Sequence, residues 1–250
     1  MKRIGIYLGF PPEGGGAFQY SQSLLDALES LPQTKFEIVV AHAHSAWQKK
    51  LIKYRNFKPV YIYENKFDTA IRIALRFGLP IKTWRSIAKH IHPLSRQLID
   101  LGCDLWLFPA QDIWTYGLPV PAIGVIHDLM HRYESRFPEV SNFGLFSRRE
   151  RHYRRICSYS RGILVDSNIG RKHVAESYEL DMQHIHILPF VAPNYIYETE
   201  YVDKFDERYD LPRKFIFYPA QFWKHKNHLN LLKAFALACR SISDLHLVLT

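Results

Sequence analysis

Short apolar segments that alternate with helix-length segments are the feature that most limits how this chain can fold. Each apolar segment is nearly uninterrupted, which is typical of a strand buried on both faces of a parallel sheet. The segments between them carry apolar residues at helical spacing. Strands separated by helices predict an α/β fold with a doubly wound parallel sheet. The predicted strands are 4–8, 36–41, 59–63, 104–108, 122–126, 162–165 and 184–188, and the predicted helices are 17–31, 68–77, 83–101, 146–160 and 170–178.

Residues 191–201 interrupt this alternation and are the predicted linker. We therefore expect an N-terminal Rossmann-like domain over residues 1–195 and the beginning of a second one over residues 196–250. The second domain is expected to be incomplete, because the sequence stops at Thr250, on a strand with no covering helix after it. After the linker a strand, a helix and a strand are predicted at 215–218, 227–239 and 245–249.

The composition predicts a packed protein of a reducing compartment. Hydrophobic residues make up 47% of the 250 residues, which excludes a disordered chain. The three cysteines lie far apart, so they predict neither a disulfide framework nor a thiolate metal site. The N-terminal apolar run is too short for a signal peptide, and no segment approaches the roughly 18 apolar residues of a membrane span. These features predict a cytoplasmic location.

Positive charge is in excess and clustered. Lys and Arg number 33 against 24 Asp and Glu, which gives a formal charge of +9. The segments 47–58 and 148–161 carry basic residues with aromatic residues interleaved. Such clusters suit anionic partners, including phosphorylated ligands and acidic membrane surfaces, although a solvated helix face shows the same pattern. No motif of a nucleic-acid-binding domain accompanies them, so DNA and RNA are not expected as partners.

His127 and Asp128 directly follow the predicted strand at 122–126. In open α/β sheets ligands bind outside the carboxyl ends of the strands, so this pair is a candidate for binding or catalysis. His131 gives a spacing close to the zinc-binding motif of metalloproteases. That motif requires both histidines on one helical turn, whereas a strand is predicted immediately before His127, so a zinc site is disfavoured.

A glycine loop joins the first predicted strand to the first predicted helix. Gly14, Gly15 and Gly16 would let the backbone approach an anion, and the free N–H groups and dipole of the helix favour phosphate there. The loop has neither the lysine of a Walker loop nor the spacing of a dinucleotide fingerprint. A phosphate-binding loop and a simple tight turn both remain open from this segment alone.

The segment 219–228, Pro-Ala-Gln-Phe-Trp-Lys-His-Lys-Asn-His, resembles a family of enzymes. It is similar to the retaining, nucleotide-sugar-dependent glycosyltransferases of family 4, which have the two-domain GT-B fold. The likeness is strongest to bacterial mannosyltransferase-type members that act on cell-surface polysaccharide, and it covers nearly the whole chain. Four further segments agree in order and spacing: 14–16, 127–129, 136–139 and 165–167.

The resemblance implies roles for the matching residues. His127 would lie against the donor sugar and orient it, with Asp128 beside it, and these two are the predicted catalytic pair. Glu13 and Ser167 are predicted contacts of the acceptor or the donor. For Ser167, capping of the following helix is an equal alternative.

The resemblance also implies how the donor diphosphate would be bound. Transfer from a nucleotide sugar expels a diphosphate, so the site must stabilise negative charge on the leaving oxygen. Gly15 and Gly16 match the family's glycine loop, and Lys226 matches its basic lysine. Gln221 stands where the family has an arginine, and it lacks the bidentate, charge-assisted phosphate contact of that residue. The nucleotide-diphosphate sugar is a co-substrate, and neither a cofactor nor a metal is implied.

The predicted activity is transfer of a sugar, mannose by resemblance, from a nucleotide-diphosphate sugar to a glycan or lipid-linked acceptor with retention of configuration. The family's Glu-x7-Glu region would lie beyond Thr250, so residues 1–250 alone are predicted to be inactive. The basic clusters would place the protein peripherally at the inner face of the membrane. The alternative is a non-catalytic module of this fold that binds a phosphorylated ligand or a membrane surface, which Gln221 favours.

Overall fold

The computed structural model describes residues 1–11, 15–192 and 209–250. The chain forms two compact units, each built from two segments. The first unit comprises Met1–Leu129 and Ser147–Pro193, and the second comprises Met130–Phe146 and Asn194–Thr250.

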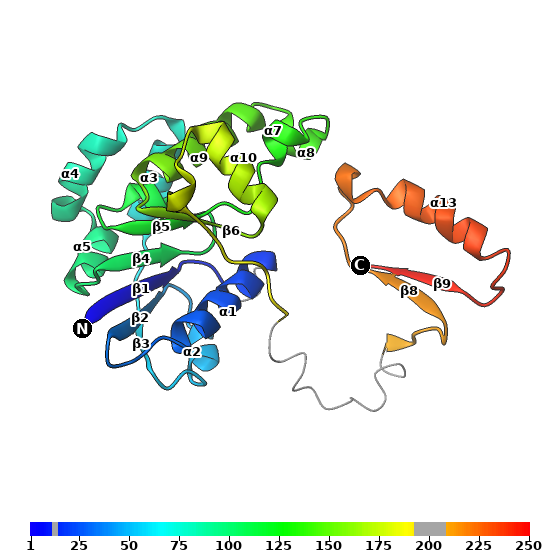
Figure 1. The fold of residues 1–250 in the computed structure, drawn as a ribbon, viewed down its shortest axis with the longest axis horizontal. Helices are drawn as coiled ribbons and strands as arrows, with labels where there is room; N and C mark the ends of the chain where they lie inside the picture. The colour runs from blue at the N-terminus through cyan, green and yellow to red at the C-terminus, as the bar shows by residue number, and fades with distance from the viewer. Residues whose placement is uncertain (12–14, 193–208) are drawn as a thin grey trace. The chain divides into compact units, whose positions relative to one another are not determined.

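A seven-stranded, all-parallel sheet forms the centre of the first unit (Figure 1). The strand order is β3-β2-β1-β4-β5-β6-β7, so the chain moves outward from β1 to β3 and then returns to the other side of β1. This reversal makes the sheet doubly wound, and the predicted fold class is confirmed. The strands are β1 (Lys2–Leu8), β2 (Phe36–His42), β3 (Phe57–Tyr61), β4 (Leu105–Phe108), β5 (Ala122–Val125), β6 (Gly162–Val165) and β7 (Ile185–Ile187).

Helices connect the successive strands of this sheet. The short helices α2 and α6 were not predicted, because too few residues are present to show a helical period. Among the described residues of both units, no helix is long and apolar enough to cross a membrane. The helices of the first unit are α1 (Gly16–Glu29), α2 (Ala46–Leu51), α3 (Lys66–Phe77), α4 (Ile81–Ile91), α5 (Pro93–Asp100), α6 (Trp114–Gly117), α9 (Leu145–Tyr159), α10 (Asn168–Tyr178) and the 3₁₀-helix η1 (Met182–His184).

The sheet separates two hydrophobic cores. Successive strand side chains point to opposite faces, and in β1 Ile6 and Leu8 pack with α1 and α2 while Tyr7 packs with α3–α6, α9 and α10. Trp106 of β4 is fully buried on the Tyr7 face, as expected for a strand residue. Gly5 makes this packing possible, because a Cβ at that position would lie 2.5 Å from the Trp106 ring. Burying a side chain of this size contributes about 3 kcal/mol or more to folding.

The single helix predicted over residues 83–101 is wrong. The structure has two helices there, α4 and α5, which meet at His92 and Pro93. Proline lacks an N–H and disfavours helical geometry in the residue before it, and His92 is accordingly extended, with φ −97° and ψ 111°. The break places the buried His92 ring 2.8 Å from both Asp68 Oδ1 and Ser95 Oγ.

The described part of the second unit contains the predicted strand, helix and strand. These are β8 (Phe215–Tyr218), α13 (His228–Ala238) and β9 (His246–Leu249), and the two strands pair in parallel. The predicted domain boundary at residue 195 and most of the predicted linker at 191–201 lie outside the described residues. The remaining elements of this unit are α7 (Met130–Tyr133), α8 (Pro138–Ser141) and the 3₁₀-helix η2 (Lys224–Lys226).

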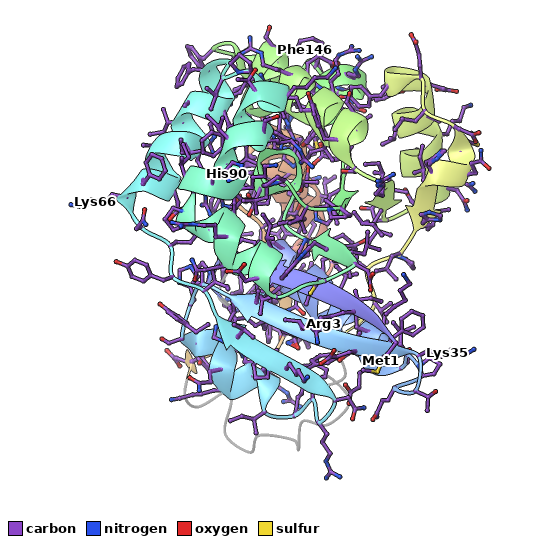
Figure 2. All side chains as sticks on the ribbon, turned by 90° about the vertical axis from the view of Figure 1, so that its left-hand side faces the viewer. Met1, Arg3, Lys35, Lys66, His90 and Phe146 are labelled. Atoms are coloured by element: carbon purple, nitrogen blue, oxygen red, sulfur yellow. The ribbon has the colours of Figure 1, made fainter. Side chains whose placement is uncertain are left out.

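Basic residues of the first unit lie both on the open surface and around one cavity. Lys35 and Lys66 are exposed and point away from the ribbon (Figure 2). Several arginines of α3 and α9 instead line one cavity. The excess positive charge of the sequence is therefore partly concentrated at one place rather than spread over the surface.

Candidate active site

The loops that follow β1, β4, β5 and β6 lie at one edge of the first unit's sheet, because these strands are parallel neighbours. The strand order reverses between β1 and β4, and ligands of open α/β sheets bind in the crevice that such a reversal creates. His127 and Asp128 lie just beyond the end of β5. The predicted position of the pair, just past the carboxyl end of a parallel strand, is confirmed, and its role in binding or catalysis stays a prediction.

His127 is held between aromatic rings. Its ring lies edge-on to Tyr20 at a centroid distance of 4.7 Å and contacts Phe190 at 5.4 Å. Neither ring nitrogen has a partner with hydrogen-bonding geometry among the described residues. Burial lowers the pKa of His127, against the opposing effects of Asp166, of the nearby Pro109 carbonyl and of Asp128. The imidazole is therefore uncharged at neutral pH, and its two buried nitrogens have unused hydrogen-bonding capacity among the described residues.

The contact with Tyr20 brings the glycine turn and His127 together. Helix α1 begins at Gly16, and Tyr20 lies one turn further along it, a rise of about 6 Å. The start of α1 and the His127 ring are therefore at the same sheet edge. Neither Tyr20 nor Phe190 was a predicted site residue, since only the fold brings them to the ring.

The glycine turn has open space beside its backbone. Gly15 adopts φ 60° and ψ −128°, a conformation that strongly favours glycine. A Cβ at Gly15 or Gly16 would meet no atom within 4 Å, and no described side chain caps the N-terminus of α1. The backbone N–H groups of the first turn can thus approach an anion. Glu13 and Gly14, the other predicted residues of this loop, lie outside the described residues.

Asp128 forms an ion pair with an arginine that was not a predicted site residue. Arg149 of α9 donates from one nitrogen to Asp128 Oδ1 at 3.0 Å, and also to the Tyr153 hydroxyl at 3.1 Å. The carboxylate of Asp128 thus fixes the start of α9 against the loop after β5. The sequence showed α9 as a basic cluster, but it did not show which arginine faces Asp128.

Ser167 caps a helix. It follows β6, and its Oγ accepts a hydrogen bond from the Gly170 backbone N–H at 3.0 Å, which satisfies one free donor of α10. Of the two predicted roles for Ser167, the capping role is confirmed. Its contact with a substrate stays a prediction.

The predicted phosphate-binding residues of the second unit lie around the end of β8. Gln221 and Lys226 are exposed, and the Lys226 carbonyl accepts a hydrogen bond from the Tyr218 hydroxyl at 2.9 Å. Glu139 of α8 binds the same loop, accepting from the His225 backbone N–H at 2.9 Å. These residues belong to a different unit from Gly15, Gly16 and His127, and the convergence of the two groups stays a prediction.

A cavity of about 370 Å³ lies at the point where the strand order reverses. The loops after β1 and β4 form part of its wall, and α3, α6 and α9 form the rest. In the part of the chain that the structure describes, no cluster of three or more His, Cys, Asp or Glu side chains could hold a metal ion. Six arginines line the cavity: Arg72, Arg76, Arg148, Arg149, Arg151 and Arg155.

Comparison with known proteins identifies the fold. No protein-family model matches the sequence, and no curated protein matches it. Among solved structures, HepE of Anabaena, determined in complex with UDP, is 11% identical with a TM-score of 0.51 and aligns with 100% of this chain and 69% of its own. Staphylococcus aureus MnaA, also determined with UDP, is 19% identical with a TM-score of 0.53, over 100% and 62%.

A third solved structure, a putative UDP-N-acetylglucosamine 2-epimerase from Listeria monocytogenes, is 13% identical with a TM-score of 0.54, over 100% and 62%. This chain thus spans about two thirds of the length of these structures. At such low identities the likeness concerns the fold alone. The chain has the α/β architecture of GT-B type, with a doubly wound parallel-sheet unit and the beginning of a second Rossmann-like unit, in which β8 and β9 pair in parallel.

Proposed function

We propose that this chain belongs to a retaining glycosyltransferase that moves a sugar from a nucleotide-diphosphate sugar to a glycan or lipid-linked acceptor. The observation that carries the proposal is the contact between Tyr20 and His127. It brings an open glycine turn, suited to a diphosphate, to the same sheet edge as an uncharged histidine, suited to a sugar hydroxyl. The fold shared with two structures determined with UDP supports the same reading.

The leaving diphosphate requires most of the stabilisation during transfer. The backbone N–H groups beside Gly15 and Gly16 and the dipole of α1 provide fixed positive potential for it. In this proposal Lys226 of the second unit adds a full charge, and no metal is required. Gln221 supplies a neutral amide where an arginine would supply a charge, so the donor is expected to bind more weakly than in relatives with that arginine.

His127 orients the donor sugar in this mechanism. As an uncharged imidazole it donates one hydrogen bond and accepts another, which suits adjacent sugar hydroxyls near the reacting carbon. The acceptor hydroxyl attacks that carbon from the side of the leaving group, and its proton passes to the departing phosphate oxygen. The glycosidic bond forms as the bond to the diphosphate breaks, with retention of configuration and without a protein nucleophile.

A membrane-bound acceptor is part of the proposal. In the basic segment 47–58, Trp47 and Tyr54 are buried, whereas Lys49, Lys50 and Arg55 are exposed. Attraction to the anionic inner face of a membrane would therefore be electrostatic, without insertion of these rings. Co-sedimentation with vesicles should increase with their anionic lipid content and fall at high salt; sedimentation indifferent to both would contradict this part.

The likeness to a putative nucleotide-sugar epimerase favours a second candidate, an enzyme that converts one nucleotide sugar to another. Both candidates require binding of a nucleotide sugar, but only the transferase requires an acceptor. The test is calorimetric titration of the whole protein with UDP- and GDP-sugars, followed by incubation with radiolabelled donor with and without acceptor lipids. Label in the acceptor supports transfer, and a changed nucleotide sugar without acceptor supports the epimerase. Absence of binding to every donor would favour a non-catalytic module.

A further inference from the structure

The arginine cavity has far more positive than negative charge. Two of its arginines are neutralised, since Arg72 pairs with Glu64 at 2.7 Å and Arg149 pairs with Asp128 at 3.0 Å. The other four make no ion pair with a carboxylate among the described residues: Arg76, Arg148, Arg151 and Arg155. One carboxylate of the described chain, Asp112, lines the cavity, and its oxygen accepts from the Trp114 backbone N–H at 3.0 Å.

Several of these arginines are held in place by backbone carbonyls. Arg155 donates to the Leu75 carbonyl, and its guanidinium lies over the Tyr116 ring at 5.7 Å. Arg151 donates to the Arg76 carbonyl at 3.3 Å. The Nε of Arg72 is buried and has no hydrogen-bond partner among the described residues. Guanidinium groups that are fixed in advance lose less entropy when they bind a ligand.

His152 is the histidine of the cavity wall. Its Nε2 lies 2.9 Å from the Gln111 carbonyl and its Nδ1 lies 3.1 Å from the Tyr116 hydroxyl. These partners fit a neutral ring that donates from Nε2 and accepts at Nδ1. Burial, together with Arg76, Arg149 and Arg155, lowers the pKa of His152 to about 4, while the Gln111 carbonyl opposes this. The uncharged ring adds no further repulsion between the arginines.

We propose that this cavity binds a phosphate or diphosphate group carried by the acceptor, an inference that rests on the proposed glycosyltransferase function. Arginine forms bidentate, charge-assisted hydrogen bonds with phosphate oxygens, and a volume of about 370 Å³ is within the range of small-ligand sites. The Asp128–Arg149 ion pair joins the cavity wall to the loop of His127. A phosphorylated acceptor would thus be held beside the sugar that His127 orients, while the donor diphosphate lies at the glycine turn.

The test measures calorimetric binding of inorganic pyrophosphate to the full 250-residue chain at about 0.15 M salt, where weak surface attraction is screened. The variant Arg76→Gln/Arg148→Gln removes two exposed cavity arginines whose side chains make no hydrogen bond or ion pair among the described residues. We expect at least a tenfold loss of affinity, since a hydrogen bond to a charged group contributes about 1.5–3 kcal/mol. The matched control Arg96→Gln/Arg240→Gln removes the same charge from exposed positions outside the cavity and should change affinity less than twofold.

Each result decides the proposal. Equal affinities of the two double variants, or absence of pyrophosphate binding to the wild type, would overturn it, provided that circular dichroism shows folded protein. Loss of binding in Lys226→Gln with no loss in the cavity variant would assign the anion to the donor site and would also overturn it. The cavity variant should still bind nucleotide sugar; if no form binds nucleotide sugar but pyrophosphate binding depends on the cavity, the proposed function fails and the anion site stands.

A second measurement distinguishes a lipid-linked acceptor from a soluble phosphorylated acceptor as the source of the phosphate group. Vesicles of phosphatidylcholine with phosphatidic acid present a phosphomonoester on a lipid, and vesicles of phosphatidylcholine alone do not. If the acceptor is lipid-linked, the protein should co-sediment with the vesicles that contain phosphatidic acid. This co-sedimentation should decrease in the cavity variant and persist in the control variant. A soluble phosphorylated acceptor predicts pyrophosphate binding that depends on the cavity, with equal sedimentation of both double variants.

Discussion

The loop after β5 and the arginine cavity lie on the same sheet edge but have opposite chemistry. In the loop, His127 is uncharged and surrounded by the rings of Tyr20 and Phe190. The cavity is lined by six arginines, by His152, whose pKa is lowered by burial, and by a single carboxylate of the described chain. An apolar wall with free ring nitrogens suits the hydroxyls and ring of a sugar, whereas fixed guanidinium groups suit phosphate.

The difference indicates how one edge can discriminate between two substrates. A neutral histidine and charged arginines would each bind a different part of the reacting pair, the histidine the donor sugar and the arginines the acceptor phosphate. Asp128 lies between the two regions, because it follows His127 in the chain and pairs with Arg149 of the cavity wall. Substitutions in these regions should therefore affect different quantities. The positions to substitute are His127, His152, the glycine turn and the Asp128–Arg149 ion pair.

The largest effect is expected from His127→Ala. Removal of a group that contacts the reacting sugar should lower the rate of sugar transfer at least 100-fold, or about 2.7 kcal/mol. Initial rates of the whole protein with radiolabelled donor measure this, alongside pyrophosphate affinity, which should be unchanged. Tyr20→Phe is the control, since it keeps the ring against His127 and should change the rate less than threefold. Equal rates for wild type and His127→Ala would refute the assigned role.

His152 should make stability depend on pH. Its pKa is near 6.5 in the unfolded chain and about 4 in the folded one, so below pH 6.5 the unfolded state binds more protons. Stability should therefore fall by up to about 3 kcal/mol as the pH decreases from about 6.5 to about 4. Urea unfolding at a series of pH values across this range gives the free energy of unfolding as a function of pH. This free energy should depend less steeply on pH in His152→Gln than in the wild type. The exposed His90 serves as control, and His90→Gln should retain the wild-type dependence of the free energy of unfolding on pH.

Gly15 and Gly16 offer a matched pair that separates backbone conformation from space. Both positions are open to a Cβ, but only Gly15 has a positive φ. Gly15→Ala should lower stability by about 2 kcal/mol, because an L-residue is strained there. Gly16→Ala begins α1 with a good helix former and should leave stability unchanged within about 0.5 kcal/mol. Urea midpoints measure both, and equal destabilisation of the two variants would contradict this interpretation.

The strands could be predicted from sequence because parallel strands are buried on both faces. The run Gly162–Val165 and the run Phe215–Tyr218 match the observed β6 and β8 to the residue. The sequence did not predict the break between α4 and α5, although Pro93 lies at the break. The helical spacing of apolar residues continues on both sides of the proline and therefore suggested one helix. The spacing of apolar residues thus indicates which side chains are buried, but it does not indicate the backbone geometry that one proline imposes.

The site could be predicted only in part for a related reason. His127 and Asp128 follow a recognisable strand, so their position at the sheet edge could be read directly. Their partners Tyr20 and Arg149 are distant in sequence and become neighbours only through packing. The basic segment 148–161 was visible as charge, but charge alone does not specify which side of a helix faces a cavity.

The smallest effect is expected from Asp128→Asn. The Asp128–Arg149 pair is partly exposed, with side-chain exposures of 37% and 24%, and such pairs contribute about 1 kcal/mol or less. The variant also leaves Arg149 without a counter-charge, so pyrophosphate affinity should rise modestly, about twofold, while stability falls slightly. Glu134→Gln breaks the more exposed pair with Arg136 and should change neither quantity measurably. A loss of pyrophosphate affinity in Asp128→Asn would show that this carboxylate positions Arg149 for the anion rather than competing with it.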